Sequence, residues 1–156
     1  MMANRWIFLA SLGALVASPA VAEIGRIKSV IGIATVQRAA ARIPASTGQE
    51  LLPGDWLETG KDSRITLTFV DFTRFAVGPD SRIALTKFDY DPTSQTGSFV
   101  AQVERGTIAV VSGKIAKTRC GGQAPGAEPS CGGMEIRTPD AKLDIRGTRF
   151  IVSVPK

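Results

Sequence analysis

Glycine and proline interrupt this sequence so often that they decide which elements it can form. The 16 glycines and nine prolines stand between short apolar runs that are rich in β-branched residues. Runs of this length suit strands, whereas an isolated helix needs about 12 residues or more to be stable. No segment shows a convincing helical period. The sequence therefore predicts an all-β fold, with polar loops at residues 38–48 and 89–97.

One pattern occurs twice along the chain. Residues 62–69 (DSRITLTF) recur as residues 80–88 (DSRIALTKF). In each copy Asp-Ser is typical of a turn, and Ile-x-Leu is the alternation of a strand. The two copies could be successive coils of a solenoid that stack their Ile and Leu side chains into one core. Alternatively, residues 65–70 and 73–77 form a hairpin, and the repeat reflects similar turns. The sequence leaves both arrangements open.

The first 22 residues have the features of a secretory signal peptide. Arg5 supplies positive charge, Trp6–Ala17 form an apolar stretch, and Ala20 and Ala22 make an A-x-A cleavage site. The apolar stretch is too short to span a bilayer, which takes about 20 residues. We therefore expect cleavage before Glu23 and a periplasmic or secreted mature protein. Residues 23–156 have a length that suits one domain.

The two cysteines, Cys120 and Cys131, flank a loop rich in glycine and proline. An oxidising compartment favours their pairing, so we expect an intramolecular disulfide. A zinc site built on the same two residues lacks further ligands, because the chain has no histidine and no other cysteine. The sequence predicts neither a metal nor another cofactor.

The charge of the chain is moderately basic and evenly spread. The full sequence has 19 basic and 14 acidic residues; loss of Arg5 with the signal peptide leaves 18 basic residues and a net charge of +4. Such a charge suits solubility, and it would also allow contact with anionic envelope polymers. The sequence contains no basic cluster interleaved with aromatics, so we do not expect a nucleic-acid partner.

The residue inventory argues against an enzyme. Without histidine, a Ser-His-Asp or Cys-His nucleophile pair is impossible. Phosphate-binding glycine loops do not occur. A pair of carboxylates could still serve glycoside hydrolysis, but most acidic residues stand beside glycine, serine or proline, as turn residues do. We therefore expect no catalytic residues, with a carboxylate-dependent glycan hydrolase as the rival interpretation.

The segment 137–154 (RTPDAKLDIRGTRFIVSV) holds the most informative motifs. Thr138-Pro139 is a turn signal, and the final run places Phe150 on the inward side of a strand. Gly147 is expected at positive φ where this strand begins. Arg146 has two interpretations: a structural side chain bridging the turn to backbone carbonyls, which we favour, or a clamp for a carboxylate or phosphate.

Several short motifs occur in the same order as in a known family. They are Gly54-Asp55, Thr59-Gly60, Asp71 with Thr73, Thr138-Pro139, and Arg146-Gly147-Thr148 with Phe150. In this order they resemble the FecR domain, the extracytoplasmic module of ferric-citrate-type sensors, over residues 24–154. Two positions depart from the pattern: Phe72 and Asp144 stand where that family has glycine.

The resemblance implies a fold and a role. The fold would be a β-solenoid-like domain of short twisted strands, with a β-sandwich or jelly roll as the alternative. Sensors of the family also carry a cytoplasmic region and a transmembrane helix, whereas this sequence starts with a signal peptide. We therefore expect a stand-alone exported domain that acts as a protein-binding, signalling or scaffold module. Its partner would be another envelope protein, with an envelope polysaccharide as the second choice.

Overall fold

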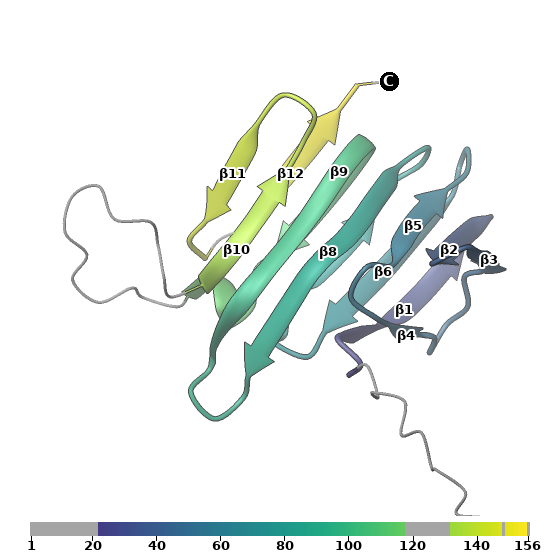
Figure 1. Ribbon diagram of the computed structural model, residues 1–156. Coiled ribbons are helices and arrows are strands. Elements are labelled where there is room, and N and C mark those ends of the chain that lie inside the picture. Colours follow the sequence, from purple (N-terminus) through teal and green to yellow (C-terminus); the bar gives the residue numbers. More distant parts are fainter. Residues whose placement is uncertain (1–21, 118–131, 148, 156) are drawn as a thin grey trace, which may run out of the picture.

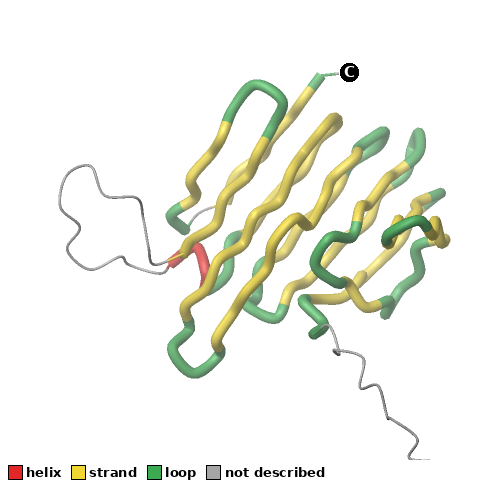
Figure 2. The backbone as a smooth tube through the Cα atoms, in the orientation of Figure 1, coloured by secondary structure: helices red, strands yellow, loops and turns green. Residues whose placement is uncertain are grey.

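The computed structural model describes residues 22–117, 132–147 and 149–155. Within these ranges the chain forms 12 β-strands and one short 3-10 helix, and it has no α-helix (Figures 1 and 2). The all-β prediction is confirmed. The elements are β1 (Gly25–Ile31), β2 (Ala34–Arg38), β3 (Ala41–Pro44), β4 (Glu50–Leu51), β5 (Trp56–Thr59), β6 (Arg64–Phe69), β7 (Arg74–Val77), β8 (Arg82–Asp91), β9 (Thr96–Val111), η1 (Ile115–Lys117), β10 (Gly132–Arg137), β11 (Lys142–Ile145) and β12 (Arg149–Val154).

A single curled sheet folds into two facing layers, and β9 belongs to both. Residues 96–105 of β9 pair with β8, and residues 106–111 pair with β7 and β12. Layer I consists of β3, β2, β5, β8, the first part of β9, β10 and β11. Layer II consists of β4, β1, β6, β7, the second part of β9 and β12. Neighbouring strands are antiparallel except for β9 and β10, which run parallel.

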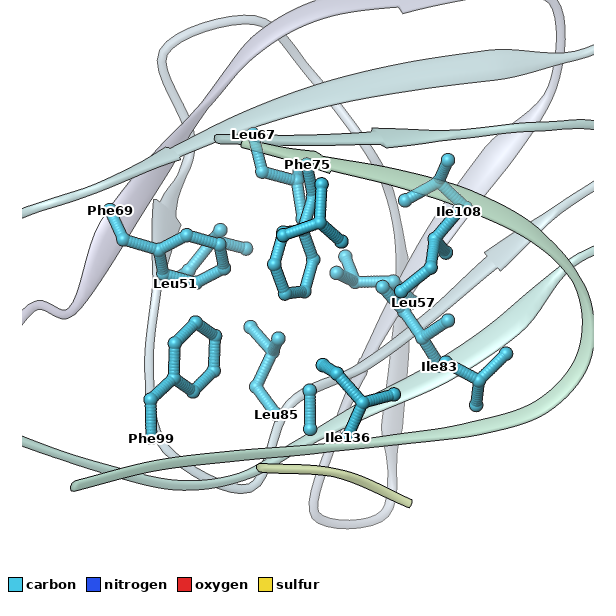
Figure 3. Close-up of a cluster of buried hydrophobic side chains, with 14 of the residues drawn as sticks. Leu51, Leu57, Leu67, Phe69, Phe75, Ile83, Leu85, Phe99, Ile108 and Ile136 are labelled. Atoms are coloured by element: carbon cyan, nitrogen blue, oxygen red, sulfur yellow. The ribbon is translucent and has the colours of Figure 1, made fainter. Parts of the chain in front are cut away.

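The core lies between the two layers, and both layers contribute buried apolar side chains to it (Figure 3). One cluster of buried apolar residues runs from Ile24 near the N-terminal end of the described chain to Val154 near its C-terminal end. Four phenylalanines connect the layers. The ring centroids of Phe69 and Phe99 lie 4.7 Å apart, and those of Phe75 and Phe99 lie 5.5 Å apart. Such contacts across the core fix the two layers face to face.

The strand pairing decides how the repeated pattern is used. β6, in the first copy, pairs with β7 as an antiparallel hairpin, whereas β8, in the second copy, pairs with β5 and β9. The hairpin interpretation is therefore confirmed. The two copies do not stack as neighbouring solenoid coils, as the resemblance had implied; they lie in opposite layers. Ile65 and Leu67 still share the core with Ile83 and Leu85, because both layers point their inward faces at the same interior.

Strands extend into both stretches that were predicted to be loops. β8 continues to Asp91 and β9 begins at Thr96, so the β8–β9 connection is much tighter than the predicted loop. β3 forms a hairpin with β2 around Ala39, which has a φ of +51°. β3 is exposed at all four positions, and Pro44 is tolerated there because an edge strand leaves one side of its backbone unpaired.

Candidate functional site

A buried serine holds the corner where β5 leads into β6. The Oγ of Ser63 accepts a hydrogen bond from the N–H of Ile33 at 2.9 Å and donates one to the carbonyl of Lys61 at 3.1 Å. Gly32 approaches this serine at a φ of +76°, and a Cβ on Gly32 would lie 2.5 Å from Ser63 Oγ. Asp62, before the serine, has a φ of +58°, which aspartate tolerates better than most residues.

The same arrangement recurs where β7 leads into β8. The Oγ of Ser81 accepts a hydrogen bond from the N–H of Thr107 at 3.0 Å and donates one to the carbonyl of Pro79 at 3.1 Å. Gly106, at a φ of +91°, is the glycine that approaches, and Asp80 has a φ of +50°. The repeated pattern therefore encodes one corner twice. Each corner carries the chain from one layer to the other and is approached by a glycine, which lies between β1 and β2 at the first corner and within β9 at the second.

Thr59 and Gly60 connect the two corners. The Thr59 hydroxyl donates to the carbonyl of Gly78 at 2.6 Å and accepts from the N–H of Ser81 at 3.0 Å. Gly60 donates its N–H to the carbonyl of Ile33 in the first corner and accepts from Asp80 in the second. Thr59 is 3% exposed, so these bonds form in a nearly dry environment. The Thr-Gly motif thus fixes the two corners to each other.

Asp55 and Gly54 order the turn before β5. The Asp55 carboxylate is fully buried and accepts from Nε and Nη2 of Arg38, both at 2.8 Å, and from the N–H of Leu52 at 2.9 Å. The hydrogen bond from Arg38 to Asp55 raises the pKa of the guanidinium. Gly54 has a φ of +88°, the value that the second corner of a type II turn requires. The charged carboxylate of Asp55 therefore holds this turn in place.

Asp71 and Thr73 form a second buried polar cluster. Asp71 accepts from the N–H of Thr73 at 3.0 Å and from its hydroxyl at 2.7 Å. Thr73 in turn accepts from the N–H of Gly113 at 3.0 Å, so the β6–β7 turn holds the chain that leaves β9. Phe72 keeps the left-handed conformation that glycine would adopt there, with a φ of +69°, and its side chain is 66% exposed.

The C-terminal motif residues lie at one edge of the sheet. Thr138 donates its backbone N–H and its hydroxyl to the carbonyl of Ala141, and its hydroxyl accepts from the N–H of Ala141, which closes the β10–β11 turn around Pro139. Gly147 has a φ of +79°, as the sequence predicted. Phe150 is half-buried against the core. The side chain of Arg146 is 88% exposed and contacts the carboxylate of Asp144 at 3.5 Å, so the structure places it on the surface instead of across the turn.

Three of the predicted features fall partly or wholly outside the described residues. They are the signal segment up to residue 21 with Ala20, the cysteine pair Cys120 and Cys131, and Thr148. Ala22 and Glu23 are described and precede β1, where Glu23 forms an ion pair with Arg26 at 2.6 Å. The disulfide and the cleavage site therefore remain predictions.

The described residues offer little for catalysis or metal binding. No group of three or more metal-ligating side chains occurs among them. The two fully buried carboxylates, Asp55 and Asp71, are already saturated by a guanidinium, a hydroxyl and backbone N–H groups. A carboxylate in that state is poorly placed to act as a base. Within the described ranges, no helix is long and apolar enough to cross a membrane.

Comparison with protein families gives one match. The family described as FecR protein matches residues 55–156, about two-thirds of the chain. The chain belongs to the FecR family. The match begins at Asp55, so it includes both corner serines and both buried aspartates but not β1–β4. FecR proteins are a regulatory and signalling family. Comparison with the curated proteins and with the solved structures gave no match.

The outer face of layer I in this FecR domain is neutralised by its own ion pairs. Its strands β3, β5, β8, β9, β10 and β11 carry both signs of charge close together. The pairs are Arg42–Glu58 (3.2 Å), Arg105–Glu58 (2.6 Å), Arg82–Glu104 (3.3 Å), Arg137–Glu135 and Lys142–Glu135 (3.0 Å). Arg82 also lies over the ring of Trp56 at 4.7 Å. This face is therefore largely satisfied within the domain.

The outer face of layer II is different, and sequence reasoning missed it. The outward positions of β6, β7, the second part of β9 and β12 are Arg64, Thr66, Thr68, Arg74, Ala76, Thr107, Ala109, Val111, Arg149, Ile151 and Ser153. They include three arginines and no carboxylate. Strand parity alone could have placed each arginine outward. Only the strand register puts these positions on one face.

Proposed function

We propose that this FecR-family protein is a non-enzymatic binding module of the bacterial envelope that acts through another protein. The observation that carries the proposal is how the family's polar motif residues are used. Four of these residues are buried, and their hydrogen bonds hold turns of the backbone in place. They are Asp55, Thr59, Asp71 and Thr73. A scaffold of this kind presents its outer faces, and those faces are where a partner can bind.

The proposal includes export through the predicted signal peptide. The mature protein would begin at Glu23 in the periplasm or outside the cell. There Cys120 and Cys131 would form their disulfide. Mass measurement of protein recovered from the periplasm should give a chain that starts at Glu23, two mass units lighter than its reduced form. Two thiols that react without prior reduction would rule the disulfide out.

The rival from another class is a hydrolase of envelope glycans that uses a carboxylate pair. Incubation of the purified protein with peptidoglycan and with chromogenic glycosides separates the two functions. We expect no turnover. Turnover that is abolished by substitution of a single aspartate or glutamate would overturn the proposal. Crosslinking in living cells should instead capture one protein reproducibly.

A further inference from the structure

The β6–β7 turn carries an aromatic side chain at a strained position. Phe72 has a φ of +69°, a conformation in which a bulky residue is a genuine outlier and which glycine adopts without cost. Hydrogen bonds from Thr73 to Asp71 and from Gly113 to Thr73 fix the backbone on both sides. The phenyl ring is nevertheless 66% exposed, so it contributes little to the core. Strained residues of this kind concentrate at functional sites.

Phe72 stands beside the basic face of layer II. Arg74 is two residues further on, and it faces outward in a row of paired positions that crosses five strands. The row is Arg149, Val111, Arg74, Thr68 and Arg26. The arginines occupy alternate strands, so their Cα atoms lie about 10 Å apart. Glu23 and Glu50 contact Arg26 at one end, but no carboxylate of the described chain pairs with Arg74 in the middle.

Exposed apolar side chains lie on both sides of this arginine row. Val70, 45% exposed, accompanies Phe72 at one side. Ile151, 71% exposed, lies at the other, in a row with Ala109 and Ala76. Arginine and aromatic residues are enriched in protein interfaces and supply most of their binding energy. The face thus combines the positive charge of Arg74, which no carboxylate of the described chain pairs, with exposed apolar side chains on both sides.

We propose that this face, defined by Phe72, Val70, Arg74, Arg149 and Ile151, is the docking surface for a protein whose contact face carries carboxylates around an apolar pocket for Phe72. The inference rests on the proposed function, because it names the partner chemistry of that binding module. The positive charge of Arg74 selects an acidic partner by charge complementarity. The exposed phenyl and isoleucine favour a protein over an anionic polysaccharide, since a protein surface offers far more apolar area to bury them.

A photoreactive amino acid at Thr68, inside the arginine row, tests where the partner binds. Thr35 is the matched control, because it is another half-buried, outward-facing threonine but lies on layer I. We expect the protein with the probe at Thr68 to capture an acidic protein in living cells, and the protein with the probe at Thr35 to capture none. Capture from Thr35 alone would overturn this docking surface and leave the proposed function standing. Capture from neither position would overturn both.

Substitutions then test which side chains carry the binding. Phe72→Gly relieves the strained φ, so it should fold at least as stably as the wild type while crosslinking at Thr68 falls about tenfold or more. Arg74→Glu should abolish crosslinking. Arg42→Glu, on layer I, should leave it unchanged. Unchanged capture in Phe72→Gly would contradict the role of the ring.

Dextran sulfate, a polyanion without apolar surface, separates the protein partner from a polymer partner. Binding of dextran sulfate to the purified protein should be weak, and added salt should remove it. If dextran sulfate binds tightly, competes with crosslinking at Thr68 and is lost in Arg74→Glu but not in Phe72→Gly, the face binds anionic polymer and the inference is overturned.

Discussion

The two corners of this FecR domain and its C-terminal edge both depend on turns with a glycine at positive φ, yet they are held by different means. At the corners, Ser63, Ser81 and Thr59 make their hydrogen bonds at 1%, 0% and 3% exposure. At the edge, formed by β10, β11 and β12, the polar side-chain contacts are exposed, and several of them are ion pairs. Arg137 and Lys142, for example, are 50% and 67% exposed where they meet Glu135.

The degree of burial decides how much each of these polar contacts contributes to the free energy of unfolding. A buried donor or acceptor that loses its partner costs about 1–3 kcal/mol, because no water replaces the lost bond. An exposed ion pair contributes about 0–1 kcal/mol. The domain should therefore depend strongly on its corners and weakly on the polar contacts of its edge. The segment 137–154, which holds the most informative motifs of the sequence, belongs to this weaker edge.

The largest expected effect comes from adding one methyl group at matched glycines. Gly106 and Gly147 have similar φ values, +91° and +79°. A Cβ at Gly106 would lie 2.4 Å from the Cα of Ser81, whereas at Gly147 its nearest neighbour would be the flexible side chain of Lys117, at 3.2 Å, with the carbonyl oxygen of Ala116 in ordinary contact at 3.6 Å. Gly147→Ala should cost the backbone strain alone, about 1–2 kcal/mol. Gly106→Ala should cost clearly more in urea unfolding. Equal losses of unfolding free energy in the two variants would show that the close approach of Gly106 to Ser81 adds no cost of its own.

The next comparison truncates one phenylalanine of the core and one of the C-terminal edge. Phe75 and Phe150 share one row of the sheet, because both pair with Val110. Phe75 is fully buried, so Phe75→Ala should lower the free energy of unfolding by about 3–5 kcal/mol. Phe150 is only half-buried, and Phe150→Ala should cost about half as much. A greater loss of unfolding free energy from Phe150→Ala than from Phe75→Ala, measured in the same urea series, would show that the C-terminal strand contributes more to stability than β7.

Thr59→Val tests how strongly Thr59 supports the second corner. The substitution keeps the shape of the side chain and removes the hydroxyl that bonds Gly78 and Ser81. We expect a loss of about 1–3 kcal/mol. In double-mutant cycles, Thr59→Val should couple to Ser81→Ala by about 0.5 kcal/mol or more, because the Thr59 hydroxyl bonds the backbone of Ser81. It should be additive with Ser63→Ala, because the Thr59 hydroxyl makes no bond to the described residues of the first corner. Additivity with Ser81→Ala as well would mean that Thr59 does not support the second corner.

The smallest effect is expected from the edge, and it depends on pH. Burial raises the pKa of the Glu135 carboxyl, but hydrogen bonds from Arg137 and Lys142 lower it by more, to below its ordinary value of 4.5. The folded protein therefore binds this proton less readily than the unfolded chain. The resulting stability is present above pH 4.5 and is lost as the pH falls through the folded-state pKa.

Glu135→Gln should remove this contribution. The variant should unfold slightly more easily than the wild type at neutral pH, and the difference should shrink in acid. Urea unfolding between about pH 3 and pH 7 measures it. Asp140→Asn, in the exposed β10–β11 turn, is the control and should leave the pH profile unchanged. A difference that grows in acid would contradict the assigned direction of the pKa shift.

The sequence by itself determined the fold class and the local turns. Frequent glycine and proline disfavour long helices, because each carries an intrinsic cost inside a helix. The left-handed conformations of Gly54 and Gly147 likewise follow from turn chemistry that acts over four residues or fewer. The order of the short motifs also indicated the family, because each motif encodes a local turn.

Only the tertiary structure decided what those turns hold together. The sequence shows that Asp62-Ser63 and Asp80-Ser81 are alike, but not that Gly32 and Gly106, far away in the chain, approach them. It shows arginines at strand positions, but not that Arg74 and Arg149 fall in one row, because a one-residue change of register moves a side chain to the opposite face. Register and layer pairing arise from contacts between distant segments. No local pattern contains that information.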